Sequence, residues 1–120
     1  EFRGAVGAVL SPAVDNDVIA KIKKRVDIPV VVTVVSEKED IERRIESGAD
    51  ILNVSGAGDT CRIIEGIRNK YPYIPIIATG GPTGDTIRET IDCGADAITY
   101  TPPTNSDLFR MTMKLFREEL

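Results

Sequence analysis

The chain has 120 residues, a formal net charge of −4 at pH 7, 42% hydrophobic residues and only 5% aromatic residues. This length and composition allow one domain with an aliphatic core of Ile, Val and Ala. Acidic and basic residues are interspersed, so the sequence lacks the basic patch of a nucleic-acid-binding protein, and we expect no nucleic-acid partner. The first apolar run, residues 5–10, is too short for a membrane span or a signal peptide. We therefore expect a soluble, cytoplasmic protein with no membrane partner.

The chain contains two cysteines and no histidine. Cys61 and Cys93 lie on predicted helices, 32 residues apart, and form no CxxC motif. This spacing argues against a zinc site and a disulfide framework, so we expect reduced, structural thiols. No carboxylate pair follows a predicted strand, so the sequence predicts neither a metal nor another cofactor. The chain begins at Glu1 without a methionine, and we expect it to be a piece of a longer protein.

Apolar runs alternate with segments of helical spacing along the whole chain. Strands are predicted at residues 5–10, 29–35, 51–54, 74–78 and 97–100, and helices at 14–25, 37–48, 59–71, 85–93 and from 105 or 106 onward. Ser36, Asp59 and Asp85 are expected to cap the second, third and fourth helices, because Ser and Asp side chains accept hydrogen bonds from the first N–H groups of a helix. Five consecutive βα units predict parallel strands joined by right-handed crossovers. The valine-rich run at 29–35 is typical of a strand covered by helices on both faces.

A repeat of 46 residues links two of these units. It consists of Ile28-Pro29-Val30 with Gly48-Ala49-Asp50, and Ile74-Pro75-Ile76 with Gly94-Ala95-Asp96. Glycine allows the left-handed turn that ends a helix, and the aspartate leads into the next strand. These motifs fall at the amino-terminal edge of the predicted sheet, whereas parallel α/β proteins bind ligands at the opposite edge. We therefore expect Asp50 and Asp96 to serve stability rather than catalysis.

Polar and glycine-rich segments follow the carboxyl ends of the predicted strands, where parallel α/β proteins hold their ligands. The candidate contacts are Asn53, Ser55 and Gly56 after the third strand, and Thr79, Gly80 and Gly81 after the fourth. Glycines let backbone N–H groups approach an anion, and the following helix N-terminus favours negative charge. Neither segment has the lysine of a P-loop and neither opens the first βα unit, so nucleoside triphosphates and NAD are disfavoured.

Several of these positions also have purely structural interpretations. Asn53 is also a candidate loop cap, Thr33 a buried strand residue, and the glycine pair a flexible turn. Arg62 and Arg88 follow the candidate turns, but a solvated helix face is the favoured interpretation. No lysine or histidine lies at a strand end, so no catalytic residue is assigned.

Ile76-Ile77-Ala78-Thr79-Gly80-Gly81, then a helix and Gly94-Ala95-Asp96-Ala97-Ile98, resembles the C-terminal end of phosphate-binding TIM barrels. These include the indole-glycerol-phosphate, tryptophan-synthase α, thiamine-phosphate and sugar-phosphate epimerase barrels, in which glycine-rich turns after strands seven and eight hold a substrate phosphate. The resemblance covers nearly the whole chain as units four to eight and implies that Gly80 and Gly81 contact phosphate. Residues 101–104 stand where the superfamily has Gly-Ser, and their two prolines remove two N–H donors. The remaining candidate contacts are Thr101, Thr104, Asn105 and Ser106. The chain also resembles uncharacterised bacterial barrel proteins that are loosely labelled hydrolases.

We therefore expect an α/β fold of five consecutive βα units in one domain, residues 1–120, forming part of a (βα)8 TIM barrel. The expected function is the ligand-binding portion of a metabolic enzyme acting on a small phosphorylated or anionic molecule. This segment alone is expected to be inactive, and to self-associate or pair with further barrel units, because five strands leave two open edges. The alternative is a flavodoxin-like three-layer sandwich with a non-catalytic binding or regulatory role.

Overall fold

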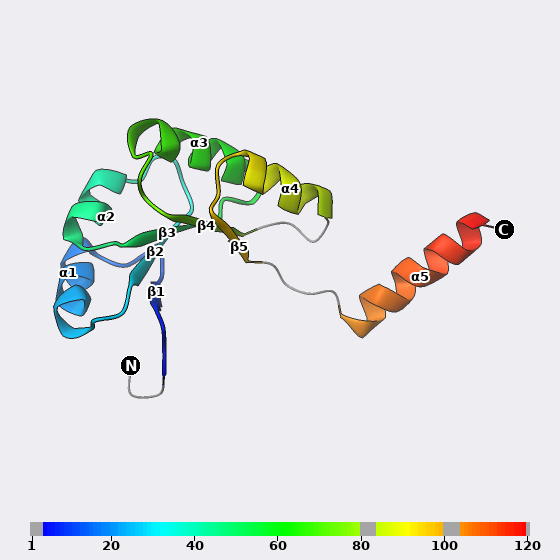
Figure 1. The fold of residues 1–120 in the computed structure, drawn as a ribbon, viewed down its shortest axis with the longest axis horizontal. Helices are drawn as coiled ribbons and strands as arrows, with labels where there is room; N and C mark the ends of the chain where they lie inside the picture. The colour runs from blue at the N-terminus through cyan, green and yellow to red at the C-terminus, as the bar shows by residue number, and fades with distance from the viewer. Residues whose placement is uncertain (1–3, 80–83, 100–103, 120) are drawn as a thin grey trace.

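The computed structural model describes residues 4–79, 84–99 and 104–119, and it contains one five-stranded parallel sheet with five α-helices (Figure 1). The elements in chain order are β1 (Ala8–Leu10), α1 (Asn16–Arg25), β2 (Val30–Val34), α2 (Ile41–Ser47), β3 (Ile51–Val54), α3 (Thr60–Lys70), β4 (Ile76–Thr79), α4 (Gly84–Asp92), β5 (Ala97–Thr99) and α5 (Asn105–Glu119). A short 3-10 turn, Ala57–Asp59, precedes α3. The predicted alternation of strand and helix is confirmed.

The strands lie side by side in their chain order, β1-β2-β3-β4-β5, and every neighbouring pair is parallel. In a flavodoxin-like sheet the strands are all parallel, but their order is 2-1-3-4-5. The second strand then lies outside the first, and the order of the strands reverses after it. The sandwich alternative is therefore wrong, and the order is that of consecutive strands of a TIM barrel.

Helices α1 to α4 lie on one side of the sheet (Figure 1). The expectation that the valine-rich strand β2 has helices on both faces is therefore wrong. One face of the sheet packs against α1 to α4, and we call the opposite face the inner face, as in a barrel.

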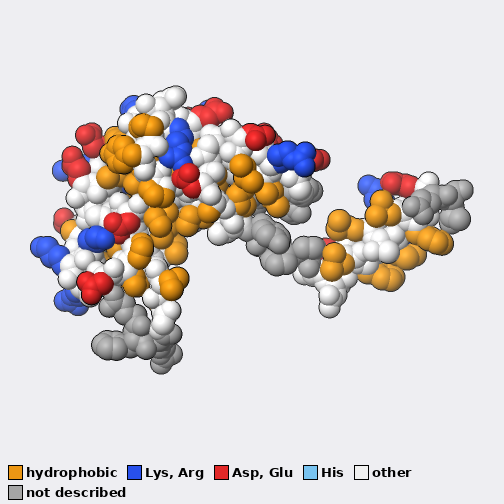
Figure 2. All heavy atoms as spheres, in the orientation of Figure 1, with side chains coloured by type: hydrophobic (Ala, Val, Ile, Leu, Met, Phe, Trp, Pro, Cys, Tyr) orange, Lys and Arg blue, Asp and Glu red, His pale blue; other side chains and the backbone are white. Residues whose placement is uncertain are grey.

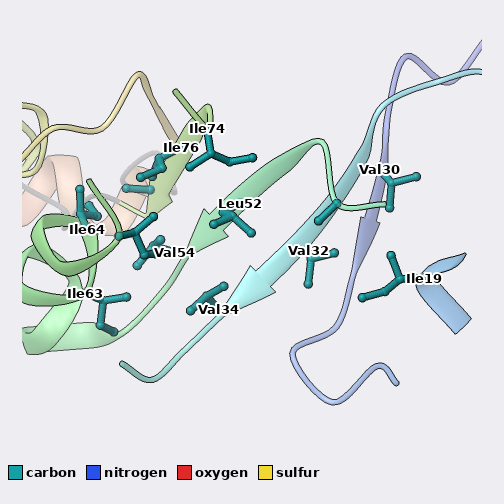
Figure 3. Close-up of a cluster of buried hydrophobic side chains, with 13 residues drawn as sticks. Ile19, Val30, Val32, Val34, Leu52, Val54, Ile63, Ile64, Ile74 and Ile76 are labelled. Carbon is teal, nitrogen blue, oxygen red and sulfur yellow. The ribbon is translucent and has the colours of Figure 1, made fainter. Parts of the chain in front are cut away.

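The hydrophobic core lies between the sheet and the helices (Figure 3). Side chains alternate between the two faces along a strand, and the even-numbered strand residues point into this core. Its fully buried members include Val30, Val32, Val34, Leu52, Val54, Ile76 and Ala78 from the strands, with Ile19 and Ile64 from the helices. The odd-numbered strand residues consequently form the inner face.

The first Gly-Ala-Asp motif ties three elements together at the amino-terminal edge of the sheet. Asp50 accepts hydrogen bonds from the backbone N–H of Val30 at 2.8 Å and from Lys23 Nζ at 2.6 Å. Gly48 ends α2 with φ of +123°, and a Cβ at this position would lie 2.9 Å from the side chain of Lys23. The glycine is required both by its left-handed backbone and by the close approach of the lysine stem.

The second motif repeats this arrangement one repeat later. Asp96 accepts hydrogen bonds from the backbone N–H of Ile76 at 2.8 Å and from the guanidinium of Arg68. Gly94 has φ of +115°, and a Cβ there would lie 3.2 Å from Arg68 Cγ. The structural role predicted for Asp50 and Asp96 is confirmed.

All three predicted helix caps are wrong. Asp85 lies inside the first turn of α4, which begins at Gly84. Helix α2 begins at Ile41, with Asp40 accepting a hydrogen bond from the Arg43 N–H at 3.2 Å, whereas the Ser36 hydroxyl accepts from the Lys38 N–H in a turn before the helix. Asp59 precedes α3 but makes no capping hydrogen bond. Its carboxylate instead forms an ion pair with Arg62 at 3.0 Å.

The expectation of reduced thiols is also wrong, because Cys61 and Cys93 form a disulfide. Cys61 lies in the first turn of α3 and Cys93 directly follows α4, and their Cα atoms are 5.4 Å apart. The sequence separation gave no sign of this pairing, since only the packing of α4 beside α3 brings the two residues together. The disulfide fastens two neighbouring helices on the outer side of the sheet.

Helix α5 extends away from the sheet and the other helices (Figure 1). It exposes a broad apolar surface to solvent (Figure 2). The exposed apolar side chains of α5 are Leu108, Phe109, Met111, Met113, Leu115 and Phe116. In the described part of the chain, the helices are too short or too polar to cross a membrane.

Candidate functional site

The inner face of the sheet changes in character from one edge to the other. Toward the amino-terminal ends of the strands it carries the aliphatic residues Val9, Val31, Ile51, Ile77 and Ala97. Toward the carboxyl-terminal ends it carries Thr33, Asn53, Thr79 and Thr99. The sheet register places Thr33 beside Asn53 and Thr79 beside Thr99. The polar half of the inner face thus lies at the edge where TIM barrels hold their ligands.

Asn53 occupies the centre of this polar half. Its Nδ2 donates a hydrogen bond to Thr33 Oγ1 at 3.3 Å. Its Oδ1 is buried and has no hydrogen-bond partner among the described residues. A buried acceptor without a donor costs about 1–3 kcal/mol, so this oxygen is suited to accept a hydrogen bond from a ligand.

The loop after β3 satisfies part of its own hydrogen bonding. The Ser55 N–H donates to the Val34 carbonyl at 2.9 Å, and the Gly56 N–H donates to Thr60 Oγ1 at 3.0 Å. A Cβ on Gly56 would lie 2.4 Å from Ile63 Cδ1. A Cβ on Gly56 would therefore require the buried Ile63 side chain to shift. The Gly56 N–H, which was predicted to contact a ligand, already donates to Thr60.

The next residue, Ala57, was not among the ligand contacts predicted from the sequence. It has φ of +51°, which is uncommon outside glycine and costs about 1 kcal/mol or more. The N–H groups of Ala57 and Gly58 have no acceptor among the described residues. They stand just before the N-terminus of α3, whose dipole favours a negative charge. No sequence signal marks an alanine in this conformation, although its flanking glycines mark the turn.

The remaining predicted contacts are placed as follows. Thr79 ends β4 on the inner face and is exposed. Gly80, Gly81 and Thr101 lie outside the described residues. Thr104 caps α5, because its hydroxyl accepts from the Asp107 N–H. The Thr104 hydroxyl and backbone N–H also donate to Asp107 Oδ2, and these two bonds lower the pKa of Asp107. The groups of Thr104 are thus engaged within its own helix.

The arginine that follows the first candidate turn is engaged in ion pairs. Arg62 contacts the carboxylates of Asp59 at 3.0 Å and Glu37 at 3.5 Å, and its side chain is 63% exposed. Arg88 is exposed on α4. This arrangement agrees with the solvated helix face that the sequence favoured for both arginines.

A separate cleft of about 480 Å³ lies between α2 and α3 on the helical side. It is lined by acidic residues of the segment that follows β2, among them Glu37, Glu39 and Asp40, and by Lys70 and Tyr71 at the end of α3. Burial raises the pKa of Glu39 against a hydrogen bond from the Val35 backbone and the charge of Arg44. The described residues contain no group of three or more acidic or cysteine side chains placed to hold a metal ion. The predicted ligand contacts that belong to the described residues do not line this cleft.

No family model and no curated protein matches the chain. Among solved structures it is similar to native KDPGal, with 22% identity and a TM-score of 0.65 over 83% of this chain and 48% of that chain. It is also similar to a protein described as a lactate oxidase from Pediococcus acidilactici, with 22% identity and a TM-score of 0.58 over 72% of this chain and 27% of that one. The chain thus spans about half the length of the first structure and about a quarter of the second. Both are TIM-barrel proteins, and together with the consecutive strand order they show that this chain has the fold of a partial TIM barrel.

Proposed function

We propose that this chain forms the ligand-binding side of a TIM-barrel enzyme that acts on a small phosphorylated or otherwise anionic molecule. The observation that carries the proposal is the inner face of the sheet, which changes from aliphatic to hydroxyl and amide side chains at its carboxyl-terminal edge. The resemblance of Thr79-Gly80-Gly81 to the phosphate turn of phosphate-binding barrels supports the choice of phosphate.

The described groups at this edge are suited to an uncharged cradle for an anion. The N–H groups of Ala57 and Gly58 have no acceptor among the described residues and are available to donate to an anion, and the N-terminus of α3 adds a favourable dipole. Ser55 and Thr79 offer hydroxyl donors. The inner-face residues described on the five strands include no carboxylate, and the nearby carboxylate of Asp59 is paired with Arg62.

The described inner face also lacks a histidine, lysine or carboxylate that could transfer protons. We therefore propose that catalytic residues come from further βα units that complete the barrel, either in the same protein or in a second copy. The reaction itself, including the hydrolase activity suggested by resemblance, stays a prediction.

Titration calorimetry with inorganic phosphate tests the proposed site. The protein should bind phosphate saturably, and Thr79→Glu, which adds a carboxylate at the carboxyl end of β4, should weaken binding about tenfold or more, because like charges repel at short distance. Thr112→Glu is the matched control, since Thr112 is exposed on α5 and its hydroxyl only donates to the Leu108 carbonyl. Absence of phosphate binding, or equal affinity in the two variants, would overturn the proposal.

A further inference from the structure

We infer that Asn53 and Thr33 together select a ligand that carries a hydroxyl group beside its anionic group. This inference rests on the proposed anion site and specifies what else the ligand must present. It arises from two unsatisfied hydrogen-bonding groups that β2 and β3 place side by side on the inner face.

The geometry leaves one acceptor and one donor unused. Asn53 Nδ2 donates its hydrogen bond to Thr33 Oγ1, while Asn53 Oδ1 has no hydrogen-bond partner among the described residues. Thr33 Oγ1 accepts this bond, and its own proton has no acceptor in the described part of the chain. The pair therefore presents an amide oxygen that can accept a hydrogen bond and a hydroxyl group that can donate one.

A ligand hydroxyl satisfies both needs, because it donates one hydrogen bond and accepts another. It also fits if the amide is turned over, since Asn53 would then offer an N–H donor in place of the oxygen. An alkyl group at this position would leave the buried amide atom unpaired, and sites built to bond a hydroxyl reject analogues that lack it. The pair is thus a specificity-determining feature rather than a source of general affinity.

The pair lies on the strand side of the proposed anion site. Asn53 is on β3, and Ala57 and Gly58 follow it by four and five residues in the turn before α3. We therefore expect the ligand hydroxyl to reach Asn53 and Thr33 while the phosphate lies at the N-terminus of α3.

Calorimetric titration with three probes tests the inference: inorganic phosphate, propyl phosphate and glycerol 3-phosphate. The protein should bind glycerol 3-phosphate about tenfold more tightly than propyl phosphate. Asn53→Leu should abolish this preference and retain phosphate binding. Asn69→Leu, the same change at an exposed position on α3, should keep the preference.

Thr33→Val provides a second variant, because valine has nearly the shape of threonine and favours strands. It should reduce the preference even if Asn53→Leu fails to fold by circular dichroism. Equal affinity of the protein for propyl phosphate and glycerol 3-phosphate would overturn the inference while leaving the anion site intact. Absence of binding by all three probes would instead overturn the proposed function, and the inference with it.

Discussion

Replacing Asp96 by alanine should lower the free energy of unfolding by about 2 kcal/mol, because a hydrogen bond to a charged acceptor contributes about 1.5–3 kcal/mol. The carboxylate accepts a bond of 2.8 Å from the N–H of Ile76, a residue that is fully buried, and alanine leaves that N–H without an acceptor. The ion pair with Arg68 adds little, since the Asp96 side chain is 56% exposed and water screens the pair. With an unfolding entropy of about 2.1 cal/mol/K per residue, a loss of about 2 kcal/mol lowers Tm by about 8 °C.

Equilibrium urea denaturation followed by circular dichroism measures this effect. Asp92→Ala is the matched control, because Asp92 is exposed at the end of α4, and it should change stability by no more than about 0.5 kcal/mol. Asp96→Asn keeps an acceptor for the Ile76 N–H but removes the charge, so its loss should fall between the two. If Asp96→Ala were as stable as Asp92→Ala, the hydrogen bond from the Ile76 N–H to Asp96 would contribute nothing to stability, which would contradict this prediction.

The hydrogen bonds that Asp96 accepts should also make stability depend on pH. The hydrogen bond from Ile76 lowers the pKa of Asp96, outweighing partial burial, which raises it, and the Arg68 side chain lowers it further. Because the folded pKa lies below the unfolded value of about 3.9, the contribution is complete above that value and disappears as pH falls through the folded pKa. The difference in unfolding free energy between the parent protein and Asp96→Ala should be constant from about pH 5 to 7 and shrink below about pH 4. A difference that grows on acidification would contradict this account.

Three further predictions concern the rest of the chain. Reducing the Cys61–Cys93 disulfide should lower the free energy of unfolding by about 3–4 kcal/mol through loop entropy, and identical denaturation curves with and without dithiothreitol would contradict this. Ala57→Gly should raise stability by about 1 kcal/mol, because glycine adopts the positive φ without strain, and a destabilised variant in the same assay would refute the strain. The protein should self-associate in sedimentation velocity experiments through the exposed apolar surface of α5, and Phe109→Glu with Phe116→Glu should reduce this association. A parent protein that stays monomeric at all concentrations would remove this proposal.

The sequence predicted the units of the fold well because their signals are local. The strand Ile51–Val54 was placed to the residue, and the glycines that end α2 and precede β5 marked true left-handed turns. The start of α2 was misplaced by four residues, because Ser36 and Glu39 mimic a capping box while Glu39 actually turns back toward the end of β2. The consecutive strand order could not be read from strand patterns alone, since a doubly wound sheet uses similar units.

The candidate site was predicted only where strand parity decides the direction of a side chain. Asn53 and Thr79 share the inner face because both are odd-numbered strand residues. A glycine at position 56 also has a structural explanation, because a Cβ there would contact Ile63 and its N–H donates to Thr60. The unusual backbone of Ala57 left no trace in the sequence, because a positive φ is set by the surrounding turn.

The strand order has a consequence for how the chain folds. Each sheet pair joins residues only 20 to 24 positions apart, as with Val31 and Ile51 or Leu52 and Ile76. Closing loops of this length costs little more entropy for one pair than for the next, so loop-closure entropy favours no particular strand pair as the first to form. The strands β1 and β5 are the two edges of the sheet, and each has one side on which no described strand is paired. Another βα unit could pair with β1 or β5 through the same parallel arrangement that joins the existing strands.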